Sequence, residues 1–195
     1  MKKNIILKGP VLTRSGYGEQ ARFALRCLRS REDLYNVFIQ PLSWGSTSWL
    51  SEPSEERTWI DQTIEKTISY IQQGGTFDTS LQVTIPNEFE ALAPVNIGYT
   101  AGIETTRVAP EWLEISNQMN KLIVVSNHSK NIFLNSSAVA INKETNQKVD
   151  DYKIQIPIDV VNYPVKKYDN LPKINLNLDY DFNFLLVSQM GIRKN

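Results

Sequence analysis

The stretch 4-NIILKGPVLTRSGYGEQARFALRCL-28 joins a short apolar run to an amphipathic segment through a loop with two glycines. The run at 4–7 is typical of a buried parallel strand. From Gly18 onward the pattern changes to a helical period, and one face carries the apolar residues Ala21, Ala24, Leu25 and Leu28. The stretch therefore predicts a strand, a glycine loop and a helix, which together begin a βαβ unit.

The same alternation continues along the chain. Further strands are predicted at 35–42, 81–85, 95–100 and 121–126, and helices begin after Ser54, near Pro110 and near Asn127. The helix after Ser54 is expected to bury Ile60, Ile64, Ile68 and Ile71, and Gly74 and Gly75 end it. This order predicts an α/β fold, a Rossmann-like, mainly parallel sheet with helices on both faces. The polar stretch 142–152 is expected to be an exposed loop.

Composition narrows the function classes. The chain has 195 residues with 21 basic and 21 acidic side chains, a balance that argues against nucleic acid as a partner. One cysteine, Cys27, and one histidine, His128, exclude an intramolecular disulfide and a multi-histidine or structural zinc site, so no metal is expected. No run approaches the roughly 18 apolar residues of a transmembrane helix, and the start lacks a signal peptide. We therefore expect a cytoplasmic protein.

The glycine loop allows several interpretations. Residues 16-GYGEQA-21 match the dinucleotide pattern G-x-G-x-x-A, but eight residues separate the strand at 4–7 from the first glycine. The second strand ends in 39-IQPL-42, without the acid that binds a ribose, so a nicotinamide or flavin site is disfavoured. Main-chain N–H groups near Gly16 and Gly18 can instead hold an anion at the helix N-terminus, next to Arg14. The alternative, that both glycines only permit a tight turn, stays open.

Three other places carry candidate functional residues. The segment after the strand at 95–100 places Glu104, Thr105 and Thr106 outside the carboxyl end of a parallel sheet, where such folds bind ligands, although a solvated loop is the simpler alternative. Trp44 follows another strand end and suits either a sugar or base platform or ordinary surface packing. His128 begins a helix that Ser126 can cap, which makes it either a surface residue or a catalytic one.

Four stretches in this order and spacing resemble the N-terminal domain of a GT-B fold glycosyltransferase of the retaining group 1, family 4-like type. They are 9-GPVLTRSGYGEQAR-22, 99-YTAGIETTRVAPEWLE-114, 121-KLIVVSNHSKNIF-133 and 184-FLLVSQMGIRKN-195. The second resembles a family pattern with a glutamate, a proline and a tryptophan after a strand, here Glu104, Pro110 and Trp112. The last resembles the opening of the donor domain, without the arginine usual near 188-SQM-190.

The resemblance implies an acceptor-side domain at 1–163, a linker at 164–181, and the first strand and turn of a truncated donor-binding domain at 182–195. An uncovered strand at 182–187 would favour self-association. It also implies sugar transfer with retained configuration from a nucleotide sugar to a carbohydrate, lipid or protein acceptor. The nucleotide sugar is a substrate, no cofactor is expected, and the chain is expected to be inactive alone.

The implied site is assigned residue by residue. Glu104 and His128 are the catalytic candidates. The donor phosphates are expected at Gly16, Tyr17, Gly18, Arg193 and Lys194, and the acceptor side at Arg14, Trp44, Thr105 and Thr106. The alternative function is a non-catalytic sugar- or nucleotide-binding α/β module, for which a missing donor domain is no loss.

Overall fold

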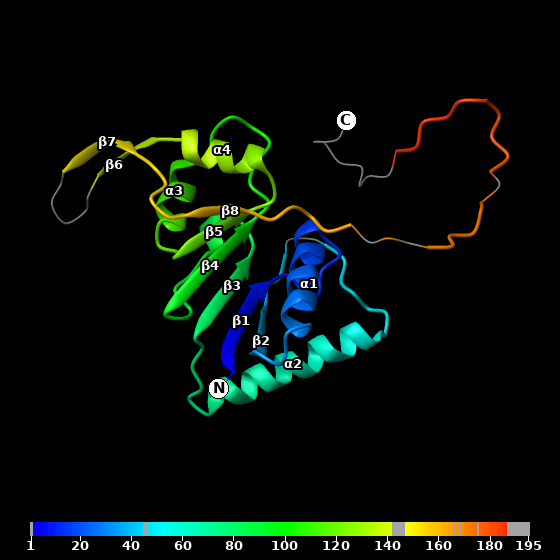
Figure 1. The fold of residues 1–195 in the computed structure, drawn as a ribbon, viewed down its shortest axis with the longest axis horizontal. Helices are drawn as coiled ribbons and strands as arrows, with labels where there is room; N and C mark the ends of the chain where they lie inside the picture. Colours follow the sequence, from blue (N-terminus) through cyan, green and yellow to red (C-terminus); the bar gives the residue numbers. More distant parts are fainter. Residues whose placement is uncertain are drawn as a thin grey trace. The chain divides into compact units, whose positions relative to one another are not determined.

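The computed structural model describes residues 2–44, 47–141, 147–165, 167, 169–174 and 176–186. Contacts divide the chain into two units, Met1–Pro164 and Val165–Asn195. The first unit is an α/β fold with a parallel sheet flanked by helices, as the alternation of strands and helices predicts (Figure 1). None of the helices in the described ranges is long and apolar enough to cross a membrane.

The sheet has six strands in the order β2-β1-β3-β4-β5-β8, and every neighbouring pair is parallel. The strands are β1 (Lys3–Gly9), β2 (Tyr35–Pro41), β3 (Thr79–Val83), β4 (Val95–Thr100), β5 (Lys121–Val124) and β8 (Ile158–Val160). Strands β1, β2 and β5 contain short apolar runs, as is typical of parallel strands that are covered on both faces. The Rossmann-like fold predicted from the sequence is confirmed.

The helices are α1 (Gly16–Arg29), α2 (Glu55–Gln72), the short 3₁₀ turn η1 (Pro86–Glu88), α3 (Pro110–Ser116) and α4 (Asn127–Asn135). Helices α2 and α4 follow the predicted capping residues Ser54 and Ser126, and α3 begins at the predicted Pro110, whereas α1 begins two residues before the predicted Gly18. Ser15, Ser54 and Ser126 each accept a hydrogen bond from a main-chain N–H three residues later. Gly74, at φ +77°, follows the end of α2 in the left-handed conformation that glycine tolerates.

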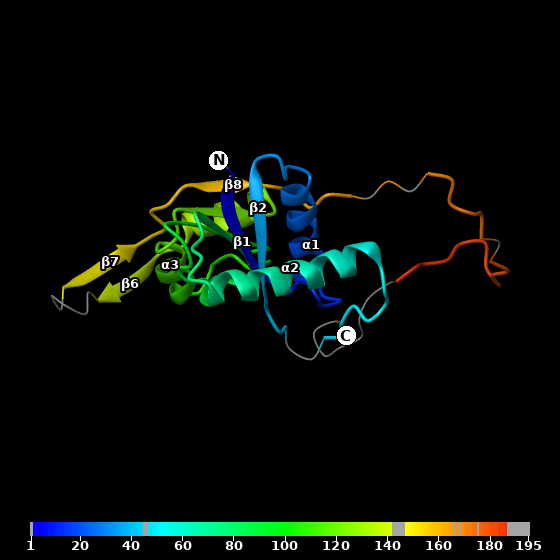
Figure 2. The same ribbon diagram turned by 90° about the horizontal axis from the view of Figure 1, so that it is seen from below.

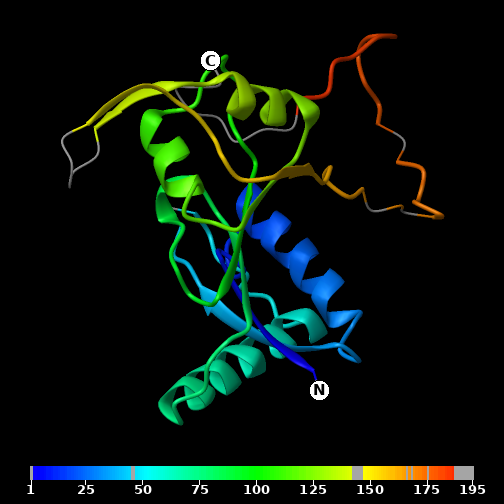
Figure 3. The same ribbon diagram turned by 60° about the vertical axis from the view of Figure 1, so that its left-hand side comes forward.

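Two apolar clusters cover the two faces of the sheet. On one face, Leu7 and Ile39 of the strands pack with Ala21 and Leu25 of α1. On the other face, the strand residues Leu122 and Val124 pack with buried residues of α3 and α4, Leu113 and Phe133. Figure 3 shows α1 on one side of the strands and α3 on the other. Burial of a complete leucine, valine or phenylalanine side chain in these clusters stabilises the fold by about 1.5–3 kcal/mol, because its apolar surface is removed from water.

Helix α2 differs from its predicted packing. Ile60 is buried, but Ile68 and Ile71 are each 52% exposed, and threonines face inward in their place. The reason is that α2 runs along the outer edge of β2, where main-chain groups need polar partners. The Thr67 hydroxyl oxygen accepts a hydrogen bond from the Ile39 N–H at 2.9 Å. An apolar periodicity cannot reveal a helix that covers a strand edge.

A second small sheet replaces part of the predicted 142–152 loop. Strands β6 (Ala138–Ile141) and β7 (Lys148–Tyr152) form an antiparallel hairpin that projects from the parallel sheet (Figures 1 and 2). The prediction was wrong for 148–152, because cross-strand main-chain hydrogen bonds allow a polar segment to form a strand. Residues 142–146 lie outside the described residues.

The second unit carries the predicted linker and donor-domain strand. Its described residues form neither a helix nor a strand, and Phe184 and Leu185 are 92% and 90% exposed. The rest of the predicted strand and turn, 187–195, lies outside the described residues. The donor-domain assignment and the self-association of 182–187 therefore stay predictions.

Candidate functional site

The candidate site lies where the loops leave the carboxyl ends of the parallel strands. From β1 the chain moves outward to β2 and then returns to β3 on the other side of β1. Such a reversal creates a crevice in an open α/β sheet, and ligands of this fold class bind there. The glycine loop follows β1, and the segments 101–109 and 125–126 follow β4 and β5 at the same edge.

The glycine loop is held by hydroxyl groups at the start of α1. The Ser15 hydroxyl oxygen accepts a hydrogen bond from the Gly18 N–H at 2.9 Å and lies 2.8 Å from the Thr13 hydroxyl. A Cβ on Gly18 would lie 2.2 Å from the Thr13 carbonyl oxygen, whereas a Cβ on Gly16 would meet nothing within 4 Å. Gly18 is therefore required for packing, and Gly16 leaves the helix N-terminus open.

Tyr17 links this loop to the segment that carries Glu104. Its hydroxyl lies 2.9 Å from the Thr100 hydroxyl and accepts a hydrogen bond from the Ala101 N–H at 3.1 Å. Its ring packs against Trp44, with the ring centroids 4.8 Å apart. Tyr17 is thus part of the site's framework.

We expect Tyr17→Phe to lower the free energy of unfolding by about 1–2 kcal/mol, because Thr100 is fully buried and the Ala101 N–H loses its acceptor. Chemical denaturation of both proteins measures the difference. Tyr35→Phe is the matched control, since no described residue bonds to the Tyr35 hydroxyl. Equal losses in the two variants would contradict the bridging role.

The segment after β4 packs closely on the start of α4. Gly102 has φ +79°, and a Cβ there would lie 2.6 Å from the Ser129 hydroxyl oxygen. The Ser129 hydroxyl also donates a hydrogen bond to the Ala101 carbonyl at 3.1 Å. Only glycine fits both the conformation and the space at position 102.

A cavity of about 290 Å³ brings the two catalytic candidates together. Glu104 lies on the segment after β4, and His128 lies in the first turn of α4. The other lining residues come from the same two segments and from the chain after β8, and they are Ala101, Gly102, Ile103, Val125, Ser126, Ser129 and Tyr163. All of them belong to the first unit.

Two tyrosines beside this cavity stay protonated. Burial raises the pKa of Tyr163 to about 12, and the nearby Tyr17, Tyr99 and Glu104 add to the increase. Burial also raises the pKa of Tyr17, although its hydrogen bonds to Thr100 and Ala101 oppose the shift. Both hydroxyl groups are therefore neutral hydrogen-bond donors across the physiological pH range.

The predicted acceptor-side residues do not line this cavity. The Arg14 guanidinium turns to Glu52, 2.9 Å away, and is half exposed. Trp44 packs on Tyr17, and the Thr105 hydroxyl donates to the Arg107 carbonyl at 3.1 Å. Thr106 is exposed on the same loop.

Tyr163 lines the cavity from a third segment, the chain after β8, and the sequence reasoning gave it no role. It follows the last strand in a stretch with prolines and little periodicity, which gives no signal of a site. Arg193 and Lys194, the predicted phosphate contacts, lie outside the described residues. Within the described ranges, no three histidine, cysteine or acidic side chains gather where they could hold a metal ion.

Comparison with known proteins identified no related protein. A scan against protein-family models and searches of curated proteins and of solved structures found no match to this chain.

Proposed function

We propose that this chain is the acceptor-side part of a glycosyltransferase that uses a nucleotide sugar. The observation that carries the proposal is the cavity at the carboxyl edge of the sheet, in which Glu104 and His128 share one lining with hydroxyl groups. Ligand sites in open α/β sheets form at this edge, and a few convergent polar groups fix the orientation of a ligand.

The lining suits a polyol. A carboxylate such as Glu104 accepts hydrogen bonds from sugar hydroxyls, and the neutral Tyr163 hydroxyl donates to sugar oxygens. The imidazole of His128 can accept the proton of an attacking hydroxyl or orient that hydroxyl. In this proposal Glu104 and His128 contact the reacting sugars, and Ser126 and Tyr163 orient the acceptor.

The start of α1 suits the donor diphosphate. The first N–H groups of a helix have no carbonyl partner within the helix, and the helix dipole favours an anion there. Gly16 adds no side chain over this end of α1. Charge that develops on a leaving diphosphate would be stabilised by these groups together with basic side chains of a donor domain.

One observation favours the alternative function, a sugar-binding module without catalysis. Every residue that lines the cavity belongs to the first unit, so a ligand can bind without a donor domain. The two functions agree on the ligand class and differ on turnover.

A titration of the chain with monosaccharides, oligosaccharides and nucleotide sugars, followed by NMR, tests the site. We expect saccharides to shift the amide signals of 101–104 and 126–129. Glu104→Gln should weaken this binding about tenfold, because a charge-assisted hydrogen bond is worth about 1.4 kcal/mol or more. His128→Ala should also weaken it.

Two exposed positions supply the matched controls, Glu111→Gln on α3 and Asn131→Ala on α4. If the controls weaken binding as much as Glu104→Gln and His128→Ala, the site is misplaced. Sugar transfer is then measured with a nucleotide-sugar panel. Residues 1–195 should give none, and a chain that includes a donor domain should transfer sugar. Binding without transfer by that longer chain would favour the binding module.

A further inference from the structure

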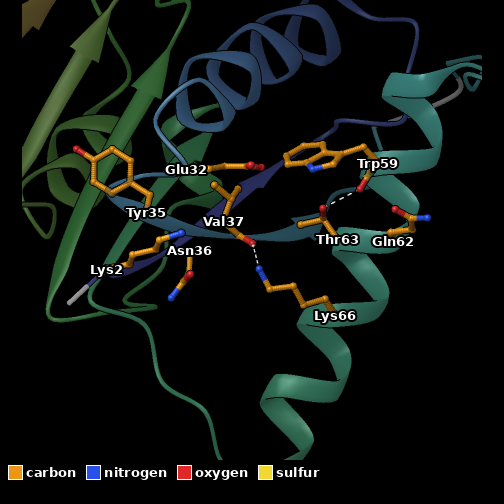
Figure 4. Close-up of a pocket in the computed structure, with 9 residues that line it drawn as sticks. All are labelled: Lys2, Glu32, Tyr35, Asn36, Val37, Trp59, Gln62, Thr63 and Lys66. Carbon is orange, nitrogen blue, oxygen red and sulfur yellow. Dashed lines mark hydrogen bonds between the residues drawn. The ribbon is translucent and has the colours of Figure 1, made fainter.

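A second cavity lies at the opposite edge of the sheet, near the amino ends of β1 and β2. Its volume is about 280 Å³, and it separates the outer edge of β2 from helix α2 (Figure 4). Lys2 precedes β1, Tyr35 and Val37 belong to β2, and Trp59 and Lys66 belong to α2. None of these residues takes part in the site proposed above.

Main-chain groups of β2 face this cavity. At one end of the hydrogen-bond ladder between β1 and β2, the Lys3 N–H donates to the Leu34 carbonyl. At the other end, the Leu42 N–H donates to the Gly9 carbonyl. In a parallel ladder with these ends, the even-numbered residues of β2 bond to β1. The odd-numbered residues Tyr35, Val37 and Ile39 therefore turn their main-chain groups outward.

Most of these outward groups have partners. The Tyr35 N–H donates to the Arg31 carbonyl at 3.1 Å, the Lys66 ammonium donates to the Val37 carbonyl at 2.9 Å, and Thr67 accepts from Ile39. In the described part of the chain, no residue bonds to the Tyr35 carbonyl or to the Val37 N–H. These two groups form one acceptor and one donor beside the cavity.

Their spacing matches the main chain of a single amino acid. In a parallel ladder, a residue opposite Asn36 donates its N–H to the carbonyl of residue 35 and accepts at its own carbonyl from the N–H of residue 37. A free amino acid carries an ammonium group and a carboxylate at the same two places. Its carboxylate would also lie near the Lys66 ammonium, which is bonded to the Val37 carbonyl.

The charges of the lining select the side chain. Residues in register on neighbouring strands place their side chains on the same face of a sheet, so an L-amino acid opposite Asn36 would point to the face of Asn36. Lys66 covers the Phe38 ring on that face, and Figure 4 shows Lys2 on the same side of β2. Glu32 and Trp59 lie across the strand from them.

The two lysines are close enough to interact. Burial lowers the pKa of Lys66, the positive charge of Lys2 lowers it further, and Glu32 opposes the shift. With one carboxylate for two ammonium groups, the lining carries a net charge of +1 (two minus one). An acidic ligand side chain would relieve this excess.

We propose that the cavity between β2 and α2 binds an acidic L-amino acid, with its ammonium on the Tyr35 carbonyl, its carboxylate on the Val37 N–H and its side chain between Lys2 and Lys66. The ligand adds one residue to the open edge of β2. This site is independent of the proposed transfer of sugar, so either assignment can fail alone.

The test is an NMR titration of the chain with L-glutamate, followed at the main-chain amides. We expect saturable shifts at Asn36 and Val37 and none at 101–104. D-glutamate would place its side chain on the opposite face of the strand, beside Glu32 and Trp59. L-glutamine has the same shape as L-glutamate but lacks the negative charge of the side-chain carboxylate. Each should bind up to about fivefold more weakly, because one favourable charge contact at a partly exposed site is worth up to about 1 kcal/mol.

Lys2→Met is the first variant, because Lys2 is exposed and its replacement should leave the fold intact. It should weaken L-glutamate binding about fivefold. Lys3→Met is the matched control, since Lys3 is also exposed, is adjacent in sequence and does not line the cavity, and it should bind like the unmodified protein.

Four results would overturn the proposal. They are an unshifted Val37 amide, equal binding of the two enantiomers, the same shifts with inorganic phosphate, and equal affinity for N-acetyl-L-glutamate N-methylamide. The last would indicate an edge that binds extended peptides rather than a free amino acid.

Discussion

Gly18→Ala should lower the free energy of unfolding of the first unit by about 3 kcal/mol, at the upper end of the usual cost of overpacking. The new Cβ would come within 2.2 Å of the Thr13 carbonyl oxygen and 3.0 Å of the Pro10 carbonyl oxygen. Both obstacles are main-chain atoms in the buried loop, so neither can rotate away. Thermal melting should show a decrease of about 6–12 °C, given about 2–4 °C per kcal/mol for a unit of this size.

Gly16→Val is the matched comparison, two residues away in the same helical turn. Because a Cβ at position 16 meets nothing within 4 Å, the melting temperature should change little. If the proposed donor site is correct, the same variant should reduce nucleotide-sugar binding, because a branched side chain blocks the helix N-terminus. Equal melting temperatures for Gly18→Ala and the unmodified protein would show that the loop relaxes, and the packing argument would be wrong.

Phe133→Ala should have the largest effect on stability, a loss of about 4 kcal/mol through a cavity in the second apolar cluster. Phe133 is completely buried and stacks on Trp112 of α3, with ring centroids 6.3 Å apart. It anchors α4, which carries His128 into the candidate site. The melting temperature should fall by about 8–16 °C.

Leu134→Ala provides the control on the same helix, because Leu134 is 46% exposed. Leu134→Ala should lower the free energy of unfolding by less than about 1 kcal/mol, since the side chain buries little apolar surface in the folded protein. A similar loss in both variants would mean that α4 is stabilised by its helix propensity and not by its contact with α3. Denaturant titration of both variants makes the comparison.

Local signals determined the order of elements before any tertiary contact was known. Apolar runs located β1, β2 and β4, and serine caps or a proline located the starts of α2, α3 and α4. These signals work because strand burial and the unpaired N–H groups of a first helical turn depend on residues within a few positions of each other. The parallel sheet then follows from the alternation of strands and helices.

The sequence also located Glu104 and His128 at strand ends, and the structure places both in one cavity. The proximity of these two residues was predictable, because the carboxyl ends of parallel strands lie at the same edge of the sheet. The different roles of Gly16 and Gly18 were not predictable. A glycine pattern looks the same whether its Cβ position is open or blocked by a carbonyl from an earlier turn of the chain.

Only the tertiary structure decided how the open edge of β2 is covered. The isoleucine period of α2 predicted an apolar face, yet Thr67 and Lys66 turn toward β2, and Ile68 and Ile71 remain exposed. Tyr163 likewise reaches the candidate site only after β8 returns the chain to that edge. Sequence by itself determined the main helices and most strands of the parallel sheet, and their order, since those depend on near neighbours, but it missed the hairpin of β6 and β7. Strand-edge hydrogen bonds and the lining of a cavity depend on residues far apart in the chain, and only folding brings them together.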